Sequence, residues 1–148
     1  MASVQETIEI DVPVQTAYNQ WTQFEEFPQF MEGVEQVTQV DDTHLEWKAK
    51  IGGVSRTWDA EIVEQVPDRR ISWRSTSGSM NAGTVTFEPL AADRSRVLLQ
   101  LEFEPEGAVE KAADALGIVE RRAKGDLERF GELITARGSE TGAWRGQV

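Results

Sequence analysis

The sequence predicts one α+β domain, in which a curved antiparallel sheet wraps around a single long C-terminal helix. Over most of residues 4–104, apolar and polar residues alternate in short segments, which is the pattern of half-buried strands. The connections between these segments are short, so successive strands are antiparallel neighbours. From residue 109 onward the apolar residues recur every three or four positions, which is the pattern of an amphipathic helix.

The chain begins with a strand and two short helical segments. The strand covers residues 4–12 and ends at Pro13, a residue that also suits the first turn of a helix. A short helix follows. Pro28 separates it from a second short turn, because proline disrupts a continuing helix. The apolar residues of that second turn are Phe27, Phe30 and Met31.

Six further strands are predicted after these helices, which brings the sheet to seven strands. Short turns separate them, including Asp41-Asp42-Thr43, Gly52-Gly53 and the segment 66–69, whose residue types favour tight turns. The predicted strands cover residues 34–40, 45–51, 54–62, 70–75, 84–88 and 96–103.

The C-terminal helix is predicted to span about 108–136, roughly 40 Å at 1.5 Å per residue. Gly117 and Gly125 lie inside it, and each costs up to about 1 kcal/mol relative to alanine. We therefore expect a close approach or a bend at these positions. The domain comprises residues 1–136, and residues 137–148 form a polar, Gly-containing tail.

Composition excludes several classes of function. The net charge is −11, which opposes binding to nucleic acid phosphates and to anionic membranes. No apolar run approaches the ~20 residues that span a bilayer, and the N-terminus lacks the features of a signal peptide. We expect a cytoplasmic protein, monomeric or homodimeric, without membrane insertion and without a nucleic acid partner.

The sequence offers no set of residues for a metal or cofactor site. It contains no cysteine and one histidine, His44, which stands beside the Asp41-Asp42-Thr43 turn and is interpreted as a solvated turn residue. Glycine-rich loops of the phosphate-binding types are absent. We therefore expect neither a metal nor a cofactor.

The predicted sheet has one apolar face, and the long helix is the only element large enough to cover it. Alanines alternate with large residues along the apolar side of that helix, which leaves room for a pocket, although alanines also permit tight packing. The order of elements resembles that of the START-like (SRPBCC) superfamily, which has the helix-grip fold. Residues 17–31, AYNQWTQFEEFPQFM, resemble the signature of its polyketide cyclase/dehydrase branch, close to the coenzyme Q-binding proteins. This resemblance covers roughly residues 3–136 and implies an apolar cavity between the sheet and the helix, without a common catalytic set.

Aromatic residues and one arginine are the strongest candidates for that cavity. Trp47, Trp58 and Trp73 fall on the apolar faces of three consecutive strands, either as core or as cavity walls. Arg56 shares its face with Trp58, and it either stands at the rim or anchors an oxygen-bearing ligand inside. The predicted lining is completed by Phe87 and Leu101 from the sheet, by Leu116, Val119 and Ala123 from the helix, and by Phe27, Phe30 and Met31 at one mouth.

Three functions fit these features. The leading hypothesis is the binding of a small hydrophobic molecule of the lipid, isoprenoid or aromatic type. The first alternative is an enzyme of the polyketide cyclase/dehydratase type, for which Arg56, Ser75, Ser77 and Asn81 could polarise a carbonyl. The second is a protein-interaction domain with a vestigial cavity. The sequence identifies no catalytic residues.

Overall fold

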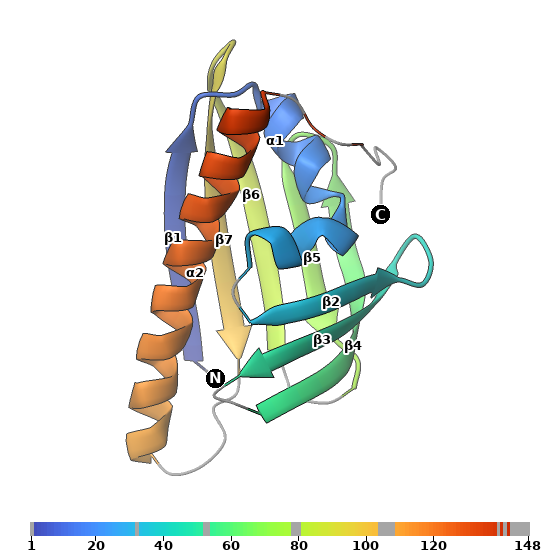
Figure 1. Cartoon of the computed structure of the whole chain (residues 1–148), viewed down its shortest axis with the longest axis vertical. Helices are drawn as coiled ribbons and strands as arrows, with labels where there is room; N and C mark the ends of the chain where they lie inside the picture. Colours follow the sequence, from blue (N-terminus) through green and yellow to red (C-terminus); the bar gives the residue numbers. More distant parts are fainter. Residues whose placement is uncertain are drawn as a thin grey trace.

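The computed structural model of the protein describes residues 2–31, 33–51, 54–77, 81–103 and 109–138, together with 140 and 142. For residues 2, 51, 54, 103, 109–116 and 118 it describes the backbone alone. Within these ranges the chain forms the predicted helix-grip fold: one antiparallel sheet, two short helical segments after the first strand, and a long C-terminal helix (Figure 1).

The sheet contains seven strands in the described ranges, arranged in the order β1-β7-β6-β5-β4-β3-β2. All neighbouring pairs are antiparallel, as the short connections predict. The sheet curls, so that β2 and β3 run obliquely to β1 and β7 (Figure 1). The strands are β1 Ala2–Ile10, β2 Val34–Gln39, β3 His44–Ile51, β4 Val54–Val66, β5 Arg70–Ser75, β6 Asn81–Ala91 and β7 Arg94–Phe103.

The long helix α2, Val109–Arg137, agrees with the predicted span. It lies along β1 and touches β7 only lightly (Figure 1). The close approach falls at Gly131: a Cβ there would stand 2.9 Å from Ile10 Cγ2 and 3.0 Å from Ile8 Cδ1. At Gly117 the expected close approach is not found, since no described atom lies within 4 Å of a Cβ placed there.

The two short helical segments are separated before Pro28, the position at which the sequence predicts the break. Helix α1, Val14–Trp21, ends at Thr22, whose hydroxyl donates to the carbonyl of Asn19 at 2.6 Å. The second segment is the 3-10 helix η1, Phe24–Gln29, and Pro28 lies inside it. The tighter turn places Phe24 and Phe27 on the buried side.

Side chains of α2 hold η1 against the helix. Arg129 Nε donates to the carbonyl oxygen of Phe30 at 2.8 Å, and its guanidinium also pairs with the largely buried carboxylate of Asp126. Near the end of α2, Arg137 donates to the side chains of Gln20 and Gln29. These bonds are charge-assisted, and together they fix how the segment Phe24–Phe30 sits over the sheet.

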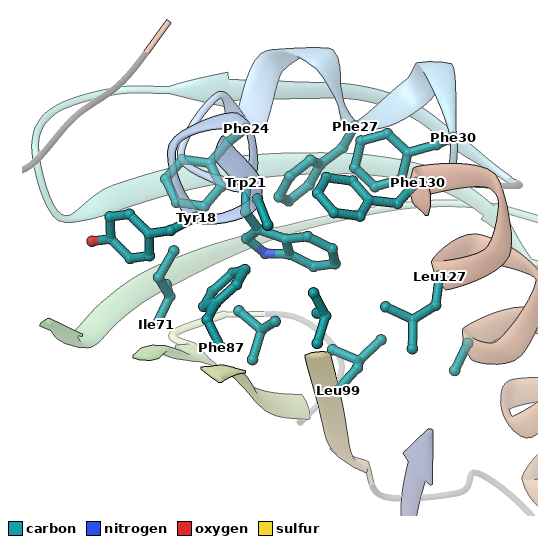
Figure 2. Close-up of a cluster of buried hydrophobic side chains, with 14 of the residues drawn as sticks. Tyr18, Trp21, Phe24, Phe27, Phe30, Ile71, Phe87, Leu99, Leu127 and Phe130 are labelled. Carbon is teal, nitrogen blue, oxygen red and sulfur yellow. The ribbon is translucent and has the colours of Figure 1, made fainter. Parts of the chain in front are cut away.

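The core is densest where α1, η1 and α2 meet the sheet. Trp21 lies at the centre of an aromatic cluster, with its ring centroid 4.9 Å from Phe130, 5.5 Å from Phe27 and 5.8 Å from Phe30 (Figure 2). Phe87 of β6 closes the cluster from the sheet side at 6.3 Å. Most of these rings meet edge to face or tilted, the arrangement that aromatic quadrupoles favour.

The described part of the tail contacts α1. Asn19 Nδ2 donates to a carboxylate oxygen of Glu140 at 3.3 Å, and a Cβ on Gly142 would stand 2.8 Å from the side-chain oxygen of Gln23. The chain therefore turns back over α1 after α2 ends. The division into a domain of residues 1–136 and a tail of 137–148 stays a prediction, and Trp144 lies outside the described residues.

Replacing Phe130 with alanine should destabilise the fold by about 3–5 kcal/mol, because the ring is fully buried and its removal leaves a void against Trp21 and Phe30. Urea denaturation followed by circular dichroism measures this loss. The control is Val40→Ala at a side chain that is 64% exposed, which should change stability by less than about 0.5 kcal/mol. Equal losses in the two variants would contradict the proposed role of the aromatic cluster.

Candidate functional site

The inward-facing side chains change from fully buried to half-buried along the sheet. At the end beneath α1, Ile71, Val85 and Val97 are completely buried. Toward the other end, inward-facing residues of the same or neighbouring strands are half-buried, although they project toward the interior. We call this second region the open end of the grip. Its half-buried apolar side chains are Trp58 on β4, Trp73 on β5, Leu101 on β7 and Val119 on α2.

A stacked pair of tryptophans links the aromatic cluster to the open end. Trp47 and Trp58 are direct partners across β3 and β4, and their rings lie 5.8 Å apart at an interplanar angle of 6°. Trp47 is 7% exposed and also contacts Phe27 at 5.6 Å. The rings therefore form a continuous path from Trp21 through Phe27 and Trp47 to Trp58, which is the first ring in this path with appreciable exposure.

Trp73 lies over Gly83, its direct partner on β6. A Cβ on Gly83 would stand 2.3 Å from Cζ2 of the indole, so the ring occupies the place of the missing side chain. Leu101 of β7 is the next residue in the same cross-strand row and is also half-buried. Sequence reasoning missed Gly83, although a glycine inside a strand is a recognised sign of close approach.

Of the three α2 residues predicted to line the cavity, the structure shows one with an accessible side chain at the open end. Val119 is half-buried at the open end, whereas Ala123, one turn further along, is 2% exposed and packs in the core. Leu116 belongs to α2, but its side chain lies outside the described residues. The structure thus brings Val119 into the same region as the sheet tryptophans and places Ala123 at its inner boundary.

The residues predicted at a mouth lie within the aromatic cluster or beside it. Phe27 and Phe30 are 1% and 2% exposed, and Phe87 contacts Tyr18 and Trp21 from the sheet. Met31 is half-buried and packs on the edge of the same core. In this conformation these residues close the interior on the side of α1, and their role as a mouth stays a prediction.

Few ionisable side chains project inward on the described part of the sheet. Arg56 is half-buried, and its register opposite Ala49 places it on the inner face, two residues from Trp58. Glu6 faces inward on β1, opposite Leu99. Ser75 accepts a hydrogen bond from the backbone N–H of Asn81 at 3.0 Å. By contrast, Ser77 donates to the exposed carboxylate of Asp59 and lies away from this region.

His44 is the exposed first residue of β3, directly after the turn at residues 41–43. Its Nδ1 lies 2.8 Å from Oδ1 of Asp41, and the same oxygen accepts the backbone N–H groups of Thr43 and His44 at 2.9 Å. Mainly the Thr43 bond, and next the His44 side chain, lower the pKa of Asp41 below its usual value. These contacts shape the turn, as the sequence predicts, and they lie outside the grip.

A separate hollow of about 440 Å³ lies against β1, β7, β6 and β5. Alternation along the strands shows that most of its lining side chains project outward, away from α2. Among them, Ser72 and Thr84 are hydrogen-bonded to each other at 2.9 Å. Four residues of the inner face, Val4, Trp73, Gly83 and Leu101, also line this hollow, so it adjoins the open end of the grip through the sheet. The outward residues are Ser3, Gln5, Val63, Ser72, Arg74, Ala82, Thr84, Gln100 and Glu102.

No group of three or more His, Cys, Asp and Glu side chains suited to a metal occurs among the described residues. Within the same residues, no helix combines the length and the apolar character that a membrane crossing requires. The absence of a cofactor and the cellular location stay predictions.

A curled sheet, a long helix along one edge, and half-buried aromatic rings inside define a helix-grip domain. The chain belongs to the family described as polyketide cyclase / dehydrase and lipid transport, which matches residues 10–130. This family connects the chain with the binding of hydrophobic molecules or with polyketide cyclase activity.

One protein is similar to this chain in sequence, and two solved structures are similar to it in fold. The chain is 53% identical to an uncharacterized 17.2 kDa protein of the melC2-rnhH intergenic region of Streptomyces lincolnensis, over 100% of this chain and 99% of that protein. It is similar in fold to the Zhui aromatase/cyclase of a Streptomyces species, with a TM-score of 0.79 and 16% identity, covering 97% and 99% of the two chains. A START superfamily protein of Mycobacterium smegmatis gives a TM-score of 0.70 with 16% identity, covering 91% and 95%.

The Asp41 carboxyl should titrate below the ordinary aspartate pKa of about 3.9. A depressed pKa in the folded state means that this group's contribution to stability is present above the unfolded pKa. It is lost as the pH falls through the folded pKa. Side-chain carboxyl NMR shifts recorded against pH measure the pKa. In His44→Gln it should rise but stay depressed, because the Thr43 N–H remains; an ordinary pKa in the unchanged protein would contradict the hydrogen-bonding account.

Proposed function

We propose that this protein binds a small hydrophobic molecule between the inner face of the sheet and α2, at the open end of the grip. The single observation that carries the proposal is the half-burial of Trp58, Trp73, Leu101 and Val119, which all face inward. Apolar side chains that face inward and stay partly accessible form a surface that a small apolar ligand can cover.

The energetics are sufficient for binding. Apolar surface contributes roughly 25 cal/mol per Å² when it leaves water, so removing about 200 Å² supplies about 5 kcal/mol before the costs of association. The half-buried ring of Trp58 offers a flat surface, and its partner Trp47 fixes that ring by stacking. A flat or polyene ligand benefits most, because aromatic faces favour offset stacking.

Arg56 supplies polarity in an otherwise apolar region. It lies on the inner face next to Trp58, and a guanidinium in such surroundings binds a ligand oxygen more strongly than it would in water. We propose that Arg56 orients the ligand by such a bond, while the tryptophans provide most of the affinity.

A reaction of the cyclase/dehydratase type is the second candidate, favoured by the family and by the similar fold of the Zhui aromatase/cyclase. Such a reaction needs groups that polarise a ketone and transfer protons. On the described part of the sheet, Arg56 and Glu6 are the inward-facing ionisable side chains on β4 and β1, which stand four places apart in the strand order. This separation favours binding over catalysis by that pair.

The dye 1-anilinonaphthalene-8-sulfonate should bind saturably and gain fluorescence, because its rings become covered by the half-buried tryptophans. Val119→Trp should weaken this binding at least about tenfold, since the larger side chain occupies the open end. The control is Glu120→Gln at the neighbouring exposed position of α2, which should bind as the unchanged protein does. Saturable binding that is unaffected by Val119→Trp would place the dye elsewhere.

Arg56→Ala should weaken oxygenated ligands more than hydrocarbons, because only the former lose a charge-assisted hydrogen bond. Competition of 2-naphthol and naphthalene against the dye provides the comparison, with an expected selective loss of about fivefold or more for 2-naphthol. Arg74→Ala, on the outer face, is the matched control. Equal losses for both competitors would place Arg56 at the rim.

A further inference from the structure

We infer that Gly83 is a specificity-determining position. Because it has no side chain, the indole of Trp73 packs against the backbone of β6, and the position of this ring determines how much space a ligand has above it. This inference rests on the proposed function and deepens it, since it concerns the thickness of ligand that the open end accepts. It depends on the geometry of one pair of residues at the centre of the sheet.

The two residues face each other directly across β5 and β6, and both project toward the interior. A Cβ on Gly83 would stand 2.3 Å from Cζ2, 2.6 Å from Cε2 and 2.9 Å from Cη2 of Trp73. These three atoms belong to the six-membered part of the indole. The ring therefore extends from β5 across its neighbouring strand, and does not stand upright in the interior.

The glycine is explained by space and not by backbone conformation. Its φ lies outside the left-handed region that favours glycine, so the backbone alone would accept any L-residue. Glycine inside a strand also weakens the strand, because it adds entropy to the unfolded chain and provides no side chain to pack. The position of the Trp73 ring is the feature that a side chain at 83 would disturb.

A methyl group at this position forces the ring into the interior. Ordinary van der Waals contact begins near 3.4 Å, so the indole must withdraw by about 1 Å or rotate. The ring lies on the inner face of the sheet, and the backbones of β5 and β6 block movement in the opposite direction. We therefore expect the displaced indole to rise from the sheet into the interior, where the proposed ligand lies.

The consequence is that the site selects ligands by their thickness. With Gly83, the ring of Trp73 packs close to the sheet beside Leu101 and leaves space for a wide fused-ring ligand. With a raised ring, the same region accepts a slim unbranched chain more readily than a wide aromatic one. Gly83 therefore favours ligands of the fused-ring class over aliphatic chains of similar carbon number.

The experiment compares Gly83→Ala with Ala82→Ser, which adds one heavy atom to the outward face of the same strand. Affinity is measured by titration with 1-anilinonaphthalene-8-sulfonate, and decanoate serves as the slim competitor. Gly83→Ala should weaken the dye about tenfold and decanoate less than about threefold, whereas Ala82→Ser should change neither. Equal affinities of Gly83→Ala and the unchanged protein for the dye would overturn the inference.

A second variant separates the position of the ring from a general loss of folding. In Gly83→Ala/Trp73→Leu the large ring is gone, so the added methyl should cost no dye affinity relative to Trp73→Leu alone. A double variant that binds about tenfold more weakly than Trp73→Leu would overturn the inference, even where Gly83→Ala alone folds poorly. Failure of the unchanged protein to bind either probe would instead reject the proposed function.

Discussion

The position of Trp21 is the constraint on which the rest of the structure depends. Its fully buried indole projects from α1 to where η1, α2 and β6 meet, and each of these three elements contributes a ring to its surroundings (Figure 2). Because interiors are close-packed, moving any one of the four elements would open a void around this side chain. The cluster thereby fixes the height of α2 above the sheet at its C-terminal half.

A helix fixed at one end need not close the interior at the other. Gly131 allows α2 to lie almost against the side chains of Ile8 and Ile10, so the helix follows the edge strand β1 and barely touches β7. The inner faces of the strands between the two edges are then shielded from solvent mainly by side chains other than those of α2. Under α1 the aromatic cluster supplies that cover, whereas Trp58 and Trp73 stay half-buried at the far end.

This asymmetry gives the proposed binding region a rigid wall and an accessible surface. Trp47 belongs to both parts: it contacts Phe27 in the cluster and stacks on Trp58 at the open end. A surface held from behind in this way loses little freedom when a ligand covers it, which favours affinity. The bond of Arg129 to the carbonyl oxygen of Phe30 adds rigidity by holding the end of η1 on α2, and Asp126 orients the Arg129 guanidinium within the helix.

The residue patterns alone were sufficient for the fold. Alternation gave the seven strands, short turns gave their antiparallel order, and the helical period gave α2 to within about one residue, because these features are local and repeat along the chain. Strand bounds were less exact: β4 covers Val54–Val66 and β6 covers Asn81–Ala91, against the predicted 54–62 and 84–88. The tryptophans of β3, β4 and β5 were placed on the inner face for the same reason. The end of α1 was predicted less well, since the helix stops at Trp21 and Pro28 lies inside the following 3-10 helix.

Burial within that inner face was decided only by the tertiary structure. Alternation assigns Phe87 and Trp73 to the same face, yet one lies in the closed cluster and the other at the open end. Likewise Gly117 and Gly131 look alike in the helix, and only the second meets β1. The sequence by itself determined which side chains face the interior, because that depends on the period of each element. Which of them stay accessible was settled by where α2 and η1 cross the sheet, because that depends on contacts between residues far apart in the chain.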